Sequence, residues 1–162
     1  MAKENTQDFL FTLFKLTTEQ FAVFEENYEV EGELEMSLQS KFKVDPKNRI
    51  LGVFLLFKLR MEESLKEVLI IECGLHFQLE KKSWDSCLSN NNKTLTIPYV
   101  YASHFSTIAI GAARGMLHAK TEGTSVNHLM LPLMTVDKFI DSNDLVLDLS
   151  NINTKKKKPN LK

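Results

Sequence analysis

The sequence predicts an α+β fold, in which a four-stranded antiparallel sheet carries a long helix and a short C-terminal helix on one face. Three observations lead to this prediction. Apolar and polar residues alternate through Val30 to Val44, which is the period of a strand with one buried face. Two further apolar segments follow across short polar segments, as in an antiparallel meander. After Pro98 the apolar residues recur every three or four positions, which is the period of a helix.

The first predicted strand, Val30 to Val44, has one apolar side and one polar side. Its apolar parity contains Val30, Leu34, Met36, Leu38, Phe42 and Val44. Its polar parity contains Glu31, Glu33, Glu35, Gln39, Lys41 and Lys43. Because successive side chains of a strand point to opposite faces, we expect a half-buried strand whose wet face runs from acidic to basic. The pattern is long for one strand, so we expect a bulge or bend within it.

Two more strands are expected after this one. The Asp, Pro and Asn residues of Asp45 to Asn48 predict a turn. Arg49 to Met61 is apolar on both parities in its first half, which indicates cover on both faces there. Glu67 to Leu79 alternates again, with its apolar residues mainly at odd positions. The N-terminal segment Phe9 to Asn27 is the candidate for the fourth strand.

A long helix is predicted to begin at Pro98, because a proline in the first turn needs no N–H partner. The apolar stripe of this helix contains Tyr101, Phe105, Ile108, Ala112 and Met116. A polar loop from Leu88 to Leu95 precedes the helix, and Thr121 to Thr124 ends it. The short second helix is expected to begin at Thr135, a residue type suited to an N-cap.

The composition favours one soluble, cytoplasmic domain. The chain has 162 residues, a formal net charge of −1 and two cysteines, Cys73 and Cys87. This charge balance does not favour nucleic-acid binding, and two separated cysteines favour neither a disulfide scaffold nor a zinc site. No apolar run is long enough for stable membrane insertion. We therefore expect a single domain over residues 1–150 and a disordered basic tail over residues 151–162.

The order of these parts resembles that of the SecB export chaperones. The resemblance is carried by Pro98 to Phe139, where a Pro–Tyr pair opens a long helix with Arg–Gly near its end. An Asn-x-x-x-x-Pro loop and a short helix follow it. Weaker support comes from the LGVFLLFKL and EVLIIECGLHFQLE segments, Leu51 to Leu59 and Glu67 to Glu80.

The resemblance implies a SecB-like fold assembled as a homotetramer, a dimer of dimers. It implies an ATP-independent holdase, a chaperone that keeps unfolded preproteins from aggregating. Such a protein delivers its clients to the SecA motor of the Sec translocation machinery for protein export. No nucleotide, cofactor or metal is implied.

A holdase needs exposed apolar surface that accepts many sequences, and Met and aromatic side chains re-pack around varied partners. The candidate client-binding residues are Phe54, Leu56, Tyr99, Tyr101, Phe105, Met130, Leu131 and Met134. The alternative for each is a place in the core, because apolar stripes are usually buried faces. An edge strand is a further means of binding, since it can add a client strand through main-chain hydrogen bonds.

Two further sets of residues concern partners. The candidate partner-docking residues are Glu31, Glu33, Glu35 and Glu72, which by resemblance form the dock for a basic surface. The alternative is an ordinary solvated strand face. The candidate oligomer-interface residues are Gly111, Ala112 and Gly115, because glycine in a helix interior is costly and its presence indicates a closely packed backbone. The alternative is packing onto the chain's own sheet.

No enzyme signature emerges from the sequence. The four histidines, His76, His104, His118 and His128, form no metal pattern, and Gly111 to Met116 lacks the end of a phosphate loop. Cys73 is expected to be an inert core thiol and Cys87 a loop residue. The prediction is therefore a non-enzymatic holdase. The alternatives are a dedicated chaperone of a single partner such as an antitoxin, and a small-ligand-binding α+β domain with a closed apolar cavity.

Overall fold

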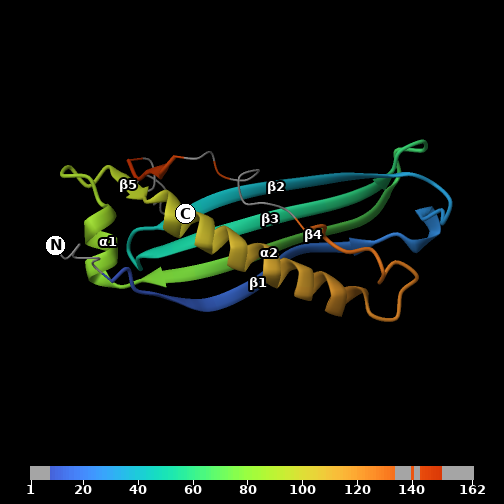
Figure 1. Ribbon diagram of the computed structural model, residues 1–162, viewed down its shortest axis with the longest axis horizontal. Helices are drawn as coiled ribbons and strands as arrows, with labels where there is room; N and C mark the ends of the chain where they lie inside the picture. Colours follow the sequence, from blue (N-terminus) through green and yellow to red (C-terminus); the bar gives the residue numbers. More distant parts are fainter. Residues whose placement is uncertain (1–7, 134–139, 141–142, 151–162) are drawn as a thin grey trace, which may run out of the picture.

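The computed structural model describes residues 8–133, 140 and 143–150. Its main element is a four-stranded antiparallel sheet in the order β1-β4-β3-β2 (Figure 1). The strands are β1 (Phe11–Val23), β2 (Leu34–Asp45), β3 (Ile50–Met61) and β4 (Glu67–Leu79). A long helix, α2 (Tyr99–Thr121), crosses one face of this sheet (Figure 1). The predicted α+β class and the four-stranded antiparallel sheet are confirmed.

The β2–β3 hairpin is regular along its whole length. Its pairing runs without a register shift from Leu34 opposite Met61 to Asp45 opposite Ile50. Of the bulge or bend expected within Val30 to Val44, no bulge interrupts β2, but the segment bends at residues 30–32. The strand is shorter than the alternating segment, because the residues before Leu34 form a turn.

The turn between β2 and β3 is held by the side chain of Asp45. Its Oδ1 atom accepts a hydrogen bond from the backbone N–H of Lys47 at 3.0 Å. Its Oδ2 atom accepts one from the side-chain amide of Asn48 at 2.7 Å. Short polar side chains that bind their own backbone favour turns, and the predicted turn is confirmed.

The fourth strand is β1, as predicted, and it lies at one edge of the sheet beside β4. The two strands pair along most of their length, with one-residue irregularities at Phe14 and Glu19. Such irregularities bend a strand and strengthen its twist. β2 forms the other edge of the sheet.

The sheet has a core face under α2 and an outer face directed away from it. The core face carries odd-numbered residues of β3 and β4, among them Leu51, Val53, Leu55, Phe57, Ile71, Cys73, Leu75 and Phe77. Because side chains alternate, even-numbered residues such as Gly52, Phe54 and Leu56 lie on the outer face. Phe54 is only 7% exposed, so β3 is covered on both sides at this point, as predicted.

α2 packs on the core face through a stripe that differs from the predicted one. Its buried residues are Ala102, Phe105, Ser106, Ala109, Ile110, Ala113, Leu117 and Thr121. Apart from Phe105, the residues of the predicted stripe are only partly buried, at the flanks of the contact. The predicted stripe was wrong because three inward positions carry alanine, whose small side chain contributes little to a hydrophobicity pattern.

The ends of α2 lie where the sequence placed them. Pro98 directly precedes the first helical residue. Beyond the last one, Gly123 has a φ of 82°, the left-handed conformation that glycine adopts without strain. The side-chain amide of Asn127 donates to the carbonyl oxygen of His118 at 2.9 Å, which satisfies one carbonyl of the last turn.

Several elements were not predicted from the sequence. They are the one-turn helix η1 (Glu25–Asn27), the helix α1 (Lys81–Cys87) and a small sheet of β5 (Thr94–Ile97) with β6 (Leu145–Asp148). Cys87 is the last residue of α1 and is buried, so its assignment to a loop was wrong. The expected polar loop Leu88 to Leu95 enters β5 at Thr94. The short helix expected from Thr135 and the basic tail lie outside the described residues.

Candidate functional site

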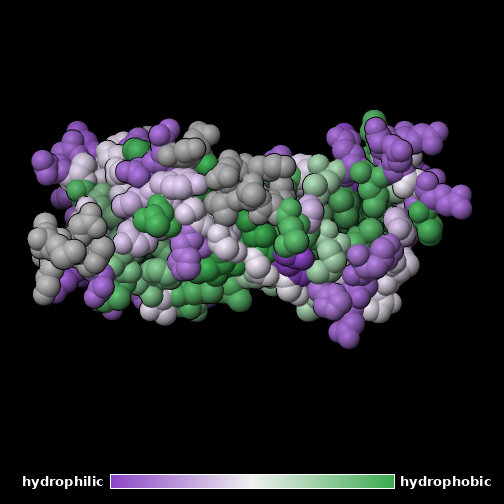
Figure 2. Space-filling view, viewed as in Figure 1, coloured by the Kyte–Doolittle hydropathy of each residue, from purple (hydrophilic) through white to green (hydrophobic). Residues whose placement is uncertain are grey.

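The N-terminal part of β1 exposes an apolar strip at the edge of the sheet. The side chains of Leu10, directly before β1, and of Leu13, Phe14 and Leu16 within it are 49, 36, 48 and 51% exposed, and we call these four the β1 strip. Figure 2 shows hydrophobic surface along the lower left of the molecule, where β1 lies below α2 in Figure 1. Within the described residues, β1 pairs only with β4, so the outward side of its backbone has no strand partner there. Such an edge is a template on which another chain can add a strand.

An aromatic cluster lies between the N-terminal end of β1 and α2. Phe9 stacks on Tyr101 with ring centroids 4.0 Å apart. The ring of Phe105 lies 4.7 Å from that of Phe11 and 4.6 Å from that of Phe77, and its side chain is fully buried. Of these two candidate client-binding residues, Tyr101 therefore reaches the surface beside β1, whereas Phe105 belongs to the core.

The other candidates on the helix side have mixed positions. Tyr99 is half-buried against the core, and its backbone N–H donates to Oδ1 of Asp144 at 2.8 Å. After α2, Met130 is 41% exposed, whereas Leu131 is 1% exposed. Met134 lies outside the described residues. Only part of this set is therefore available to a client.

The loop after α2 is tied to η1 by two hydrogen bonds. The backbone N–H of Ser125 donates to a carboxylate oxygen of Glu25 at 2.7 Å. This bond, together with one to the Ser125 side chain, holds the pKa of Glu25 below its ordinary value. The Tyr28 hydroxyl and Nε2 of His128 lie 3.0 Å apart. These contacts fix the path by which the chain reaches Met130.

Phe54 and Leu56 lie on the outer face, away from α2. Leu56 lies between Gln39 of β2 and Glu72 of β4 in the sheet register. Even-numbered residues of β3 cannot meet the helix, because they point to the opposite face from its contacts. The candidate client-binding residues therefore do not line a single groove.

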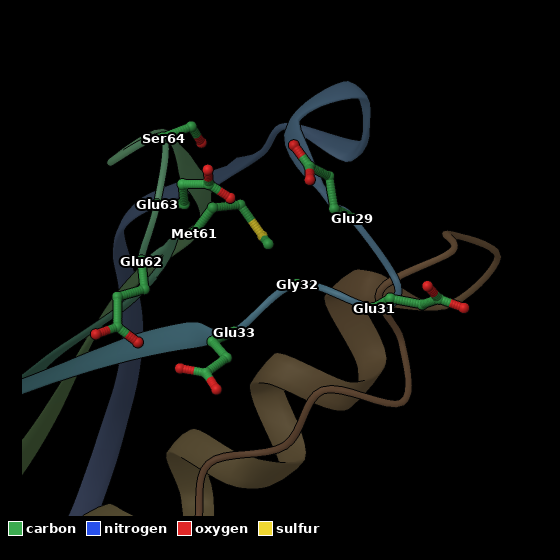
Figure 3. Close-up of a pocket in the computed structure, with 8 residues that line it drawn as sticks. All are labelled: Glu29, Glu31, Gly32, Glu33, Met61, Glu62, Glu63 and Ser64. Atoms are coloured by element: carbon green, nitrogen blue, oxygen red, sulfur yellow. The ribbon is translucent and has the colours of Figure 1, made fainter.

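Two of the candidate docking residues, Glu31 and Glu33, precede β2 instead of lying on the sheet face. They line a hollow of about 690 Å³ with three other glutamates, Glu29, Glu62 and Glu63 (Figure 3). The carboxylates of Glu33 and Glu62 point the same way in Figure 3. A hydrogen bond to Glu33 and repulsion from its charge raise the pKa of Glu62. This end of the molecule is strongly acidic.

The remaining docking candidates, Glu35 and Glu72, lie on the outer face. Glu35 forms an ion pair with Arg60 at 2.5 Å, and Glu72 is half-buried. The expectation that all four glutamates share the wet sheet face was therefore wrong for Glu31 and Glu33. The strand begins only after these two residues.

Two of the candidate oligomer-interface residues, Gly111 and Gly115, occupy the exposed side of α2. A Cβ atom added at Gly111 or Gly115 would have no other atom within 4 Å, apart from the neighbouring helix backbone. Ala112 is partly buried against the core. Packing onto the chain's own sheet thus does not explain the two glycines, and their side of the helix is open to a second backbone.

Both thiols are buried. Burial raises the pKa of Cys73 to about 11 and also raises that of Cys87, so neither is a reactive thiolate at neutral pH. The described side chains include no group of three or more His, Cys, Asp or Glu residues arranged to hold a metal ion. Over the same residues, no helix combines the length and the apolar character that crossing a membrane requires.

Two hollows in the described surface are not suited to an apolar ligand. The 690 Å³ hollow is lined mainly by glutamates. A second hollow, of about 260 Å³ on the outer face, is lined by Glu35, Ser37, Gln39, Lys58, Arg60 and Glu67. Neither has the apolar lining expected of a small-ligand-binding domain.

Comparison with known proteins shows a similarity in fold to a solved structure. The fold is similar to that of a Mycobacterium tuberculosis SecB-like chaperone, solved in complex with a ChAD peptide from the HigA1 antitoxin. The two chains are 11% identical, the TM-score is 0.48, and the likeness covers 77% of this chain and 91% of that chain. No protein-family model matches the sequence, and no curated protein matches it. The fold and the surface define an α+β protein with an exposed apolar sheet edge.

The β1 strip was missed in the reasoning from sequence, which treated Phe9 to Asn27 only as a strand. A signal was nevertheless present. Between Leu10 and Leu16, apolar residues occupy both parities and are interrupted only by Thr12 and Lys15. An edge strand that is apolar on both parities cannot bury all of its side chains.

Proposed function

We propose that this chain is an ATP-independent holdase that binds extended segments of unfolded proteins along β1. The observation that carries the proposal is the β1 strip, whose four side chains are each at least 36% exposed on an edge strand or directly before it. Exposed apolar side chains beside an open strand edge suit partners that are themselves unfolded.

The mechanism uses two kinds of contact. Main-chain hydrogen bonds to the edge of β1 do not depend on the client's sequence, because every extended chain offers the same groups. Apolar side chains of the client pack on Leu13 and Leu16, and aromatic ones reach the stacked pair of Phe9 and Tyr101. Each contact is weak and replaceable, so a client can leave without ATP.

The proposal includes an assembly of several copies. The open side of α2 around Gly111 and Gly115 is suited to contact with a second helix, because glycine permits close approach of two backbones. The assembly proposed is a homotetramer, a dimer of dimers. Light scattering after size exclusion measures its mass directly, and a monomer at all concentrations would contradict it.

The test of holding is an aggregation assay with a chemically unfolded client and no ATP. The parent chain is expected to suppress aggregation at stoichiometric amounts. The variant Leu13→Glu with Leu16→Glu places charges on the strip and is expected to lose this activity while remaining folded. The matched control is Leu65→Glu with Val146→Glu, at side chains that are 59 and 62% exposed elsewhere. Equal loss in both variants would contradict a role of β1.

Amide hydrogen exchange locates the client. Binding along the edge is expected to slow exchange of the outward amides of β1, which have no strand partner within the described residues. Protection confined to the loop after α2 would move the binding site away from β1.

Which clients the chain binds, and which protein receives them, are two separate questions. We propose unfolded preproteins as clients and SecA as the acceptor, and a pull-down with purified SecA tests the second point. Suppression of aggregation for several unrelated clients supports a general chaperone. Suppression for one co-purified partner only would identify a dedicated chaperone instead.

A further inference from the structure

The outer face has an aromatic floor, formed by the rings of Phe54 and His76, near the β2–β3 turn. The ring of Phe54 lies so close over Gly52 and Gly74 that a Cβ atom there would come within 2.7 and 2.8 Å of it. The ring of His76 meets it edge-on, with centroids 5.5 Å apart. Glycine in a strand interior weakens a sheet and often marks a place where another group approaches closely. Here that group is the Phe54 ring, which lines a shallow hollow together with Val44, Ile50 and His76.

Three exposed lysines surround this floor from both edges of the sheet. Lys41 of β2 lies opposite Phe54, and Lys15 of β1 lies opposite His76. The ammonium of Lys43 lies 4.0 Å from the centroid of the Phe54 ring. We call Lys15, Lys41 and Lys43 around Phe54 the lysine face.

Two of the acidic residues near this face, Glu19 and Asp45, are hydrogen-bonded locally, and Glu72 lies further along the same face. Glu19 accepts a hydrogen bond from the Thr17 hydroxyl at 2.5 Å. Asp45 holds the β2–β3 turn through its own carboxylate. Within the described part of the chain, no ion pair involves the lysines of this face. The three ammonium groups are therefore open to carboxylates of a partner.

We propose that the lysine face binds an extended acidic segment of a partner protein. Lys41 and Lys43 are two residues apart on one strand, so their Cα atoms are separated by about 6.7 Å. Alternate side chains of an extended peptide have the same spacing, which matches acidic residues at every second position. Phe14, 48% exposed and 6.2 Å from the His76 ring, offers a contact for an apolar residue of the same segment.

The geometry favours a protein segment over a single-stranded nucleic acid. Base recognition on a sheet uses aromatic rings whose faces are free for stacking. The face of Phe54 carries the Lys43 ammonium, and the residue is only 7% exposed. Carboxylates need no such ring, because they bind the lysines directly.

The lysine face shares Phe14 with the β1 strip, but its test changes only Lys41 and Lys43 of β2, so the two proposals fail separately. The probe is a short labelled peptide in which glutamate alternates with leucine, measured by fluorescence anisotropy with the full chain. Lys41→Gln with Lys43→Gln is expected to weaken its binding about tenfold, as two exposed ion pairs are lost. The matched control, Lys66→Gln with Lys93→Gln, changes the net charge equally and is expected to leave the affinity unchanged. Both variants are expected to suppress client aggregation like the parent chain.

Three results would overturn the proposal. Equal weakening in the control variant would show attraction to net charge alone. Equal affinity for a peptide with the same residues but its glutamates in one block would remove the argument from lysine spacing. Tighter binding of a short oligouridylate of matched charge would assign the face to nucleic acid.

Discussion

Replacing Gly111 and Gly115 by alanine tests whether the outer side of α2 is open in the single chain. Neither position has another group within 4 Å of an added Cβ, apart from the neighbouring helix backbone. Both lie inside a 23-residue helix, where glycine has the larger conformational freedom to lose on folding. Alanine therefore stabilises the helix and meets no obstacle.

The magnitude follows from helix propensity. Glycine costs about 1 kcal/mol relative to alanine in a helix interior, so the double variant gains about 2 kcal/mol in free energy of unfolding. For a chain of this size that corresponds to a rise of roughly 4–8 °C in Tm. Gly123→Ala is the internal control. Gly123 has a φ of 82°, and alanine is strained in this left-handed region, so the control variant should lose about 1 kcal/mol in free energy of unfolding.

Urea unfolding at low protein concentration measures these changes. A double variant that unfolds at lower urea than the parent would refute the reasoning, because it would mean that α2 is not open at these positions. At high concentration the same variant tests the assembly. If a second helix packs on the glycines, the added methyl groups weaken the contact and the mass in solution falls. An unchanged assembly would place its interface elsewhere.

Local structure supports four further predictions. Gly74→Ala is expected to lower the free energy of unfolding by about 1–3 kcal/mol, because the added Cβ meets Thr17 and Phe54. Urea unfolding should show a smaller decrease when the same substitution is made in a Phe54→Ala background. Cys73 and Cys87 are expected to react with a thiol reagent at mildly alkaline pH only as fast as the chain unfolds, since burial raises both pKa values. Glu25→Gln should lower the urea midpoint at neutral pH, with the difference disappearing as the pH falls through the lowered pKa of Glu25. Glu62→Gln should raise the urea midpoint at pH values above the raised pKa of Glu62, where the two carboxylates repel each other. At pH values below that pKa the variant and the parent should unfold at the same urea concentration, because protonation of Glu62 relieves the repulsion from Glu33.

β2 and β4 could be predicted because each buries mainly one face and so leaves a period of two in the sequence, whereas β3 was recognised as a continuous apolar run. Leu34, Leu38 and Phe42 of β2 pack on the core as their spacing indicates. β5 and β6 left no such signal, because each has only four residues and they pair across a long separation in the chain. Their pairing depends on the whole fold, which a local pattern does not contain.

The candidate site was only partly predictable, for a geometric reason. The sequence identifies Phe54 and Phe105 equally as large apolar residues, yet the first lies on the outer face and the second in the core. Which side of a strand is covered depends on where the helix packs. Exposure of the β1 strip likewise depends on strand order, since β1 would be covered if it were a central strand.

The two edges of the sheet differ in a way that bears on function. Proteins protect exposed edges with charges, especially lysine, and β2 carries Lys41 and Lys43. β1 has the irregularities at Phe14 and Glu19, but its N-terminal part is mainly apolar. Such an edge is either covered permanently by another copy of the chain or left open to bind partners transiently. Amide exchange in the client-free assembly decides between them: fast exchange of the outward β1 amides agrees with a holdase, whereas slow exchange would make β1 a permanent interface and exclude it as the client site.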